Sequence, residues 1–239
     1  MNRKNHIQAI RFLTISLIVA VLTACGASEI TSPKIVTPLP SETVTDVDGN
    51  VYHTVVIGNQ TWLVENLKTT HYRNGDAVSN YTANTDWSNA TSGAYCDIDN
   101  TPSNSDIYGR LYNWHVVNDS RNICPEGWHI PSDEEWFELV TYLGGASAAG
   151  VKLKETGTSH WAAPNYASNS SMFTALPGGY RNDAAEFGHI DTHGFFWTST
   201  INPSDSTTAA AYYLYHQFEG VWANYRSLKN GHPIRCVKD

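Results

Sequence analysis

The sequence predicts an α+β fold with an antiparallel β-sheet and long loops. Residues 106–117 and 132–143 carry the apolar spacing of amphipathic helices. From residue 173 onward the chain consists of short segments rich in aromatic and β-branched residues, separated by Gly, Asn, Asp and Pro. Two main helices followed by a run of strands are typical of α+β domains. We expect one such domain over residues 45–239, because about 195 residues can bury a full core.

The first 24 residues have the pattern of a signal peptide. Basic residues precede an uncharged apolar run over residues 12–24, which is too short to span a bilayer. The run ends in LTAC, residues 22–25, which resembles the lipobox of bacterial lipoproteins. In that class the signal peptide, here residues 1–24, is removed, and the mature chain begins with a diacylglyceryl-modified cysteine, here Cys25. An ordinary secretory signal followed by an incidental cysteine is the alternative.

Lipidation of Cys25 predicts a protein that is anchored to a membrane without spanning it. We expect it in the bacterial cell envelope, at the outer membrane, facing the periplasm or the cell surface. Residues 25–44 then form the lipidated cysteine and a flexible tether, since this stretch holds three prolines and many Ser and Thr.

The expected mature chain is acidic. Removal of the signal peptide takes away three of the 15 Lys and Arg residues and leaves 12, against 23 Asp and Glu. This balance argues against nucleic acid as a partner, which would need a basic surface. It also argues against a polybasic membrane contact, so acyl chains such as palmitate are the expected attachment to the membrane.

The domain opens with TDVDGNVYHTVVI, residues 45–57. DVDGN resembles part of a calcium-binding loop. With Gly49 at position 6 of an EF-hand loop, however, positions 1 and 12 are Val44 and Val55, which offer no side-chain ligand. We therefore interpret DVDGN as a tight turn into a strand over residues 51–57. A second turn then leads into the strand TWLVENL, residues 61–67.

Residues 79–106 are dominated by Ser, Thr, Asn, Asp and Gly, so we expect a long irregular loop, which in a compact domain is usually functional or mobile. In the segment that follows, Tyr108, Leu111, Tyr112 and His115 fall at i, i+3, i+4 and i+7. This spacing predicts one face of a short amphipathic helix.

The second predicted helix has clear start and stop signals. Ser132 is a good N-cap and Glu135 follows three residues later, which is the pattern of a capping box. Apolar residues continue at helical spacing over residues 136–143, and Gly144 and Gly145 predict the end of the helix. The acids of this segment are thus explained as a helix start, where the helix dipole favours negative charge.

Three cysteines follow the predicted lipidation site: Cys96, Cys124 and Cys236. In a compartment outside the cytoplasm we expect two of them to pair and one to be left over. The sequence by itself allows three pairings.

Six motifs occur in the order in which they occur in one known family. They are IGNQTWLVENLK (57–68), YGRLYNW (108–114), CPEGWHIPSDEEW (124–136), LPGGYR (176–181), FWTST (196–200) and IRCVKD (234–239). Together they resemble the Fibrobacter succinogenes major paralogous domain, which is found in secreted and lipid-anchored proteins of Bacteroidota and Fibrobacterota. The resemblance covers nearly all of residues 45–239. The biochemical role of that family is not established, so the resemblance implies a domain and not an activity.

A more distant similarity concerns the fold. WHIPSDEEW is similar to the helix start of the group that contains formylglycine-generating enzymes and C-type-lectin-like domains, and IRCVKD is similar to the closing strand of that group. The resemblance implies a C-type-lectin-like architecture in which the N- and C-terminal strands, near residues 55 and 235, pair in one sheet. It also implies a disulfide between Cys124 and Cys236, which leaves Cys96 free to pair with another chain.

The chemistry of that group is not carried over. The sequence has neither the reactive cysteines of the sulfatase-modifying enzymes nor the histidine cluster of related iron oxygenases. The E-P-N, Q-P-D and W-N-D motifs of calcium-dependent lectins are absent as well. The sequence also lacks a G-x-S-x-G elbow, a P-loop and a Rossmann glycine pattern. We therefore expect a non-catalytic domain without a cofactor.

Two histidine positions are candidate metal ligands. His189 and His193, with Asp191 between them, have the i, i+4 spacing of a helical site, but the flanking Gly188 and Gly194 predict a loop. His129 lies just before a proline and a helix cap, where a half-buried histidine bonded to the backbone is more common than a ligand, and no second His or Cys stands at zinc spacing. We therefore expect no metal, with the 189–193 segment as the alternative.

Three tryptophans are candidate ligand-binding residues. Trp87, Trp161 and Trp222 lie in polar segments, and an exposed ring beside hydrogen-bonding groups suits a sugar or a protein surface. The alternative for each is a loop residue folded back onto the core. Five other tryptophans follow the pattern of core residues: Trp62, Trp114, Trp128, Trp136 and Trp197.

These observations predict a cell-envelope lipoprotein with a non-catalytic domain that binds a glycan or a protein. Its expected partners are the membrane, through the lipid anchor, and a glycan or envelope protein held by the 79–106 loop and the loops near Trp161 and Trp222. The alternatives are an envelope enzyme or metal-dependent protein, and a purely structural envelope component.

Overall fold

The two ends of the domain meet in a five-stranded antiparallel sheet. In the computed structural model, which describes residues 42–239, the strand order is β1-β2-β3-β13-β7. Val237 pairs with Trp62 on one side and with His129 on the other. The sheet therefore joins both ends, as expected, but the direct partner of the last strand is β3, and β2 lies one strand further out. The strands are β1 (Thr43–Thr45), β2 (Val51–Ile57), β3 (Gln60–Leu63), β7 (Trp128–His129) and β13 (Val237–Lys238).

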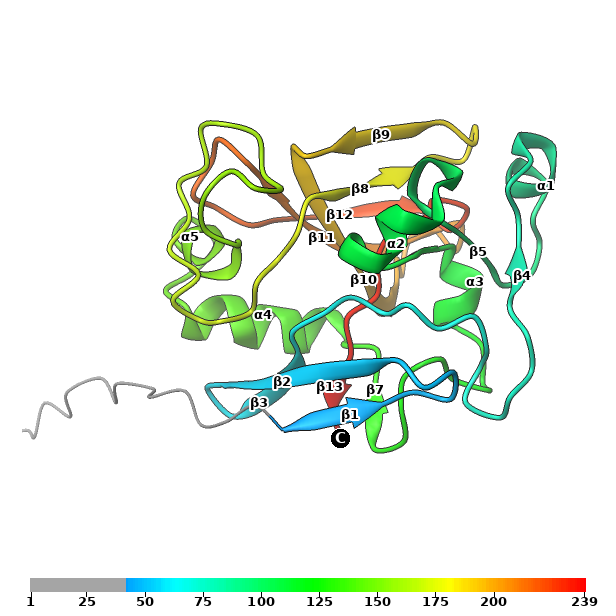
Figure 1. Cartoon of the computed structure of the whole chain (residues 1–239), viewed down its shortest axis with the longest axis horizontal. Coiled ribbons are helices and arrows are strands. Elements are labelled where there is room, and N and C mark those ends of the chain that lie inside the picture. Colours follow the sequence, from blue (N-terminus) through cyan, green and yellow to red (C-terminus); the bar gives the residue numbers. More distant parts are fainter. Residues whose placement is uncertain (1–41) are drawn as a thin grey trace, which may run out of the picture. The chain divides into compact units, whose positions relative to one another are not determined.

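The remaining strands form three smaller sheets. One is the antiparallel sheet β10-β11-β12, and a second is the hairpin β8-β9. In the third, β4-β5-β6, the first pair is parallel. The strands are β4 (Ser79–Asn80), β5 (Ala94–Cys96), β6 (Leu111–Tyr112), β8 (Gly178–Arg181), β9 (Phe187–Ile190), β10 (His193–Ile201), β11 (Thr208–Tyr215) and β12 (Trp222–Ser227). Strands thus predominate in an α+β domain, as the sequence predicts (Figure 1).

The helices are short. They are α1 (Asn84–Ser88), the 3-10 helix η1 (Ile98–Asn100), α2 (Pro102–Tyr108), α3 (Trp114–Val117), α4 (Asp133–Tyr142) and α5 (Ala149–Leu153). Within residues 42–239 only α4 has the length of a main helix, at 10 residues. None of these helices is long and apolar enough to cross a membrane. The expected signal peptide, Cys25 and most of the expected tether lie outside the described residues.

The prediction of a helix over residues 106–117 is wrong. The chain leaves α2 at Gly109, whose φ of 78° belongs to the left-handed region that favours glycine. It then continues as strand β6, where the backbone of Tyr112 exchanges two hydrogen bonds with that of His232, and enters α3 after Asn113. Tertiary pairing with a distant segment therefore overrides the local helical spacing.

Residues 79–106 form several short helices and strands, and not the long irregular loop that the sequence predicts. The segment contains β4, α1, β5, η1 and the start of α2. The start of the domain also differs from the prediction, because β1 begins at Thr43, ahead of residue 45. Thr43 pairs with His53 of β2, so the last residues of the expected tether belong to the sheet.

The prediction for the second helix is confirmed. The Ser132 side chain accepts a hydrogen bond from the Glu135 backbone, and the Glu135 side chain accepts one from the Ser132 backbone, which completes the capping box. At the other end Gly144 and Gly145 have φ values of 102° and 90°. Gly145 N–H donates to the carbonyl of Val140, as in a Schellman motif.

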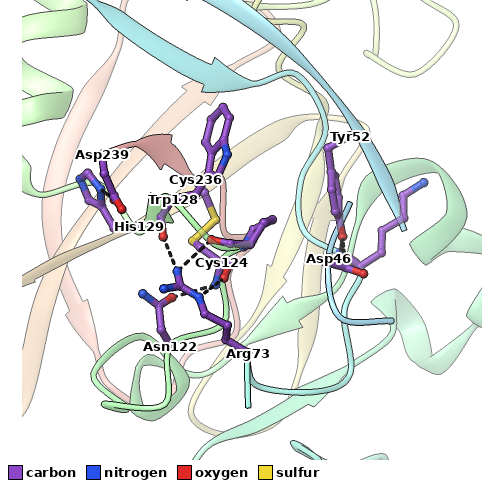
Figure 2. The surroundings of a disulfide bond; sticks show 11 residues. Asp46, Tyr52, Arg73, Asn122, Cys124, Trp128, His129, Cys236 and Asp239 are labelled. Carbon is purple, nitrogen blue, oxygen red and sulfur yellow. Dashed lines mark hydrogen bonds and ion pairs between the residues drawn. A yellow bond between two sulfur atoms is a disulfide. The ribbon is translucent and has the colours of Figure 1, made fainter. Parts of the chain in front are cut away.

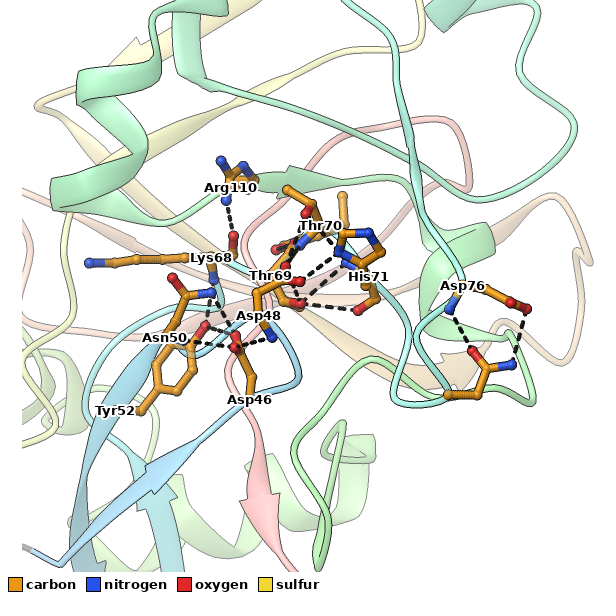
Figure 3. A network of polar contacts seen from close by, with 12 residues as sticks. Asp46, Asp48, Asn50, Tyr52, Lys68, Thr69, Thr70, His71, Asp76 and Arg110 are labelled. Carbon is orange, nitrogen blue, oxygen red and sulfur yellow. Dashed lines mark hydrogen bonds and ion pairs between the residues drawn. The ribbon is translucent and has the colours of Figure 1, made fainter.

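The DVDGN segment is a turn, as predicted. One carboxylate oxygen of Asp46 accepts hydrogen bonds from the backbone of Asp48 and Asn50, and the other accepts from the Asn50 side chain and from Tyr52 Oη at 2.7 Å (Figure 3). Asp48 in turn accepts from Thr70. The carboxylates therefore serve as acceptors for the chain itself and close the turn onto neighbouring segments.

An aromatic core lies between α4 and the strands. Trp136 on α4 stacks on Tyr212 of β11, with ring centroids 4.9 Å apart and planes at 12°. Trp62 of β3 meets Trp136 edge to face at 5.2 Å, so one helix residue joins two sheets. The five tryptophans predicted as core are all buried, each with at most 5% of its surface exposed.

A disulfide links Cys124 and Cys236, as the family resemblance implies (Figure 2). It ties the segment before β7 to the segment before β13. Next to it, Arg73 donates hydrogen bonds to the carbonyls of Cys124, Pro125 and Trp128. Cys96 is free and buried.

Candidate functional site

Trp87 and Trp161 are not surface residues. Each has 1% of its surface exposed, so the expectation that they present a ring to a ligand is wrong. The Trp87 ring lies under the guanidinium of Arg181, 4.7 Å from its centre. The Trp161 indole N–H donates to the carbonyl of Ala175 at 2.9 Å. In both cases polar neighbours in the sequence face solvent while the large apolar ring is folded into the core, which is the alternative stated above.

Trp222 is partly exposed, on strand β12. Its ring stacks on Tyr213, its partner in the register with β11, and meets Tyr215 edge to face at 4.9 Å. Phe218, which is 46% exposed, packs on it at 5.5 Å. Of the three candidates, Trp222 is therefore the one that contributes to an aromatic surface.

The structure brings together two residues of the 189–193 segment and not the third. The His189 and His193 rings lie 4.1 Å apart between centroids. Asp191 points elsewhere, with its carboxylate 3.4 Å from the Tyr108 hydroxyl. His189, in β9, and Asp191, in the turn that follows it, have positive φ values of 64° and 65°, so the i, i+4 geometry of a helix is not formed. No group of three His, Cys, Asp or Glu side chains placed to hold a metal occurs within residues 42–239.

His129, whose role the sequence leaves open, is held by two carboxylates. Its Nδ1 lies 2.7 Å from Asp239 and its Nε2 lies 2.8 Å from Glu135. Burial opposes protonation of the ring, but the hydrogen bonds to Asp239 and Glu135 outweigh it, so the pKa of His129 is raised. With both nitrogens bonded to acids, this histidine connects the capping box of α4 to the end of the chain.

A pocket of about 390 Å³ opens between the β8-β9 hairpin and one face of the β10-β11-β12 sheet. Side chains alternate across a strand, so His193 and Phe195 of β10 lie on the same face as their register partners Tyr215 and Tyr213 of β11. The opposite face of this sheet packs on α4 through residues such as Tyr212. The pocket is lined by Tyr180, Asn182, Asp183, His189, His193, Phe195, Tyr215, Tyr225, Arg226, Ser227, Asn230 and His232.

His232 belongs to the buried part of this lining. It is 1% exposed, stacks on Phe195 at 4.8 Å and meets Trp197 at 4.5 Å. Neither of its ring nitrogens has a hydrogen-bond partner within the described part of the chain. Burial, together with the positive charge of Arg226, lowers the pKa of His232 to about 3, so the ring is neutral at pH 7.

His193 lies nearer the pocket mouth. Burial lowers its pKa to about 4, and His189, His216 and Arg226 add to this effect because each opposes a second positive charge. Its ring contacts Tyr215 edge to face at 4.1 Å. The pocket therefore presents neutral imidazoles, aromatic rings and one arginine, of which the Arg226 guanidinium lies over the Tyr213 ring at 5.1 Å.

Sequence reasoning missed this pocket for a definite reason. His189 and His193 stand out in the sequence as a pair, but Tyr180, Arg226 and His232 come from three separate segments of the chain. Their convergence depends on the pairing of β8 with β9 and of β11 with β12. The available signal was the aromatic alternation of residues 193–197 and 211–215, which predicts strands but not what lies over them.

Comparison with known proteins identifies the domain. The model of the Fibrobacter succinogenes major domain matches residues 55–238, which is most of the chain and includes every residue that lines the pocket. No curated protein and no solved structure matches the sequence or the fold. The chain belongs to the Fibrobacter succinogenes major domain family.

Proposed function

We propose that this protein is a lipid-anchored envelope protein whose domain is a non-catalytic binding module, and that the pocket between β8-β9 and β10-β11-β12 binds a glycan. The observation that carries the proposal is the composition of the pocket lining. Three aromatic rings, of Tyr180, Phe195 and Tyr215, stand beside the amides of Asn182 and Asn230.

This combination suits a sugar ring. The axial C–H face of a sugar is apolar and packs on flat aromatic side chains, while its hydroxyls need donors and acceptors at fixed directions. Ser227, Asn182 and Asn230 supply such groups at the pocket wall. A volume of about 390 Å³ lies within the range of about 300–1,000 Å³ of small-molecule sites.

The position of the pocket supports an anchored binding module. β1, where the described chain begins, lies in the sheet on one side of α4, and the β8-β9 hairpin lies on the other side (Figure 1). The pocket-lining residues run from Tyr180 to His232, and none of them lies on β1. The signal-peptide pattern of residues 1–24 and the LTAC segment support the anchor itself.

We also infer that the architecture is related to the C-type-lectin-like fold. Three features support this inference: both ends of the domain share one sheet, the main helix follows directly after β7 of that sheet, and the disulfide joins the segments that precede β7 and β13. The ligand pocket proposed here does not depend on that relation, because it is argued from the residues that line it.

The proposal is tested with a glycan array and calorimetry on the purified protein. Tyr180, which lines the pocket and whose ring contacts Phe195 and His232, is changed to Ala, and the matched control is Tyr166→Ala, a tyrosine that does not line the pocket. We expect the Tyr180 variant to lose about tenfold or more in affinity for the array ligand, since truncation of a central aromatic residue in a binding site costs about 2 kcal/mol or more. Equal affinities in the two variants, or no glycan bound by the parent protein, would refute it. Capture of a protein by the same surface would identify the alternative partner.

A further inference from the structure

We propose, on the basis of the glycan-binding function above, that the ligand is an acidic glycan and that Arg226 receives its anionic group. The proposal names the chemical class of the ligand, a saccharide that bears a carboxylate or a sulfate. The observations that support it are polar side chains of the pocket that have no hydrogen-bond partner within residues 42–239.

Arg226 differs from every other arginine in residues 42–239. Each of the five others has an acceptor in the chain, since Arg73, Arg181 and Arg235 donate to carbonyl or amide oxygens and Arg110 and Arg121 form ion pairs with aspartates. Arg226 forms no ion pair in the described part of the chain, and its half-buried Nε has no hydrogen-bond partner. A guanidinium offers five N–H donors in a planar fork that matches a carboxylate or a sulfate.

The position of Arg226 is fixed by packing. Its guanidinium lies over the rings of Tyr213 and Phe195, at 5.1 and 5.8 Å from their centroids. The aromatic faces hold the charge without supplying an acceptor, so the N–H groups stay available to a ligand. Phe195 and Arg226 both line the pocket, and a sugar on the aromatic wall would bring a substituent to the guanidinium.

His232 is a second buried group of the pocket whose N–H has no hydrogen-bond acceptor in the described part of the chain. An imidazole with both nitrogens buried and unpaired is costly, because the donor and the acceptor each lose their hydrogen bond to water. Such a group in a folded protein needs an explanation, and a pocket ligand with an oxygen acceptor is one. His232 stacks on the same Phe195 that carries Arg226, so a single anionic group near Phe195 would lie close to both.

The basic side chains of the lining are three histidines and one arginine, and its acid is one aspartate. The groups that face His193 from neighbouring elements are His189 on β9, Tyr215 on β11, His216 just after β11 and Arg226 on β12. The acid in the lining is Asp183, which is exposed in the turn between β8 and β9. An anionic substituent would therefore meet one arginine and a set of imidazoles, with one acid at the rim.

Binding of an anion must be coupled to proton uptake. A negative charge beside His193 and His232 favours their charged forms and raises pKa values that are about 4 and about 3 in the free protein. The complex then binds more protons than the free protein, so its affinity for an acidic glycan rises as the pH falls. A neutral glycan in the same pocket lacks this coupling.

The test begins with an array that holds neutral, uronate-bearing, sialylated and sulfated glycans. The best acidic hit is then compared with its carboxyl-reduced or desulfated counterpart, which is the same saccharide without the charge. We expect the acidic form to bind about tenfold or more tightly, and the preference to grow between pH 7 and pH 5. The carboxylated and sulfated arms of the array distinguish the two sources of charge.

Two variants test the residues. Arg226→Gln is expected to abolish the preference for the acidic form, and Asp183→Asn, at an exposed position, is expected to raise the ratio of the affinity for the acidic form to that for the neutral form several-fold. The second variant keeps the test valid if the first does not fold. Equal binding of charged and neutral forms by the parent protein would overturn the acidic ligand and leave the glycan-binding proposal standing. An array without any glycan bound would overturn both.

Discussion

The imidazole of His129 joins the last residue of the chain to the first turn of α4. Its Nδ1 lies 2.7 Å from Asp239 Oδ1 (Figure 2). Its Nε2 lies 2.8 Å from Glu135 Oε1. Both acids are acceptors when ionised, so both ring nitrogens must donate, and the protonated imidazole is the form that satisfies this geometry. Glu135 also accepts from the Ser132 backbone in the capping box. One histidine therefore links helix capping, β7 and the C-terminus.

We expect His129 to make stability depend on pH. Its pKa is raised in the folded protein, so its stabilising contribution is complete below the unfolded value of about 6.5 and is lost as the pH rises through the higher folded value. The unfolding free energy of the parent protein should therefore exceed that of a His129→Gln variant by more at pH 5.5 than at pH 9. Urea unfolding at a series of pH values measures this difference.

His115 provides a control of opposite sign. Burial, with a contribution from Lys229, lowers the pKa of His115. Stability attributable to that residue is therefore lost as the pH falls, and His115→Gln should reverse the slope seen for His129→Gln. If His129→Gln shows a flat difference over the whole range, the ionised bridge to Asp239 and Glu135 is refuted.

The disulfide should contribute more to stability than the free cysteine. Cys124 and Cys236 are 112 residues apart, and closing a loop of that length is worth about 4–5 kcal/mol in the chain-entropy model. We expect a variant with both cysteines changed to Ala to lose most of this amount in chemical unfolding. Cys96→Ala is the control and should cost about 1 kcal/mol, because it removes one buried thiol and no cross-link.

Thiol labelling separates these cysteines in the folded protein. Burial raises the pKa of the Cys96 thiol to about 12, although Arg181 opposes the rise, so little reactive thiolate is present at pH 8. Peptide mass spectrometry should find Cys96 alkylated slowly before denaturation and rapidly after it. Alkylation of Cys124 in the unreduced, denatured protein would contradict the pairing.

The parts of the fold that the sequence predicts are those set by local chemistry. The capping box at Ser132 and the glycine stop at Gly144 act through neighbouring residues, and both are found in the structure. The single helix expected over residues 106–117 is not formed. The apolar spacing is present, but the backbone of Tyr112 forms its hydrogen bonds with His232 and not within a helix. A spacing of apolar residues does not report which distant strand will supply those bonds.

The site was predictable only in part. The pair His189 and His193 was identified from its spacing, although for a metal and with Asp191 as third member. Trp87 was expected on the surface because its sequence neighbours are polar, yet its ring fills the space under Arg181. Which ring faces out depends on tertiary packing, and no short window of sequence contains that information.

Gly109 should tolerate substitution much less than Gly75, a second glycine with a positive φ. Gly109 and Gly75 have φ values of 78° and 89°, so Gly→Ala introduces left-handed strain of about 1 kcal/mol at either position. A Cβ on Gly109 would also lie 2.6 Å from Asn66 Cβ, whereas nothing lies within 4 Å of one on Gly75. We expect Gly109→Ala to cost about 1–3 kcal/mol more than Gly75→Ala in urea unfolding. Equal costs would show that the backbone relaxes away from Asn66.

Arg235 is a buried arginine whose hydrogen bonds are expected to contribute strongly to stability. It is 1% exposed, its Nε and Nη2 donate to the same oxygen of Asn66 at 3.0 and 2.8 Å, and it also donates to the carbonyl of Phe173. Its guanidinium lies 4.2 Å from the centre of the Phe173 ring. Burial, opposed by Glu65, lowers the pKa of Arg235 to about 9, so it remains charged at pH 7.

We expect Arg235→Lys to destabilise the protein by about 3–5 kcal/mol, although it conserves the charge. An ammonium cannot reproduce the planar fork, so Asn66 and the Phe173 carbonyl lose donors while a cation stays buried. The matched control is Arg121→Lys, at an exposed arginine that pairs with Asp119, and it should change the unfolding midpoint little because solvent screens that pair. If the Arg235→Lys and Arg121→Lys variants have equal unfolding midpoints, the charge at residue 235 alone, and not the geometry of the guanidinium, stabilises the packing of β13 against the core.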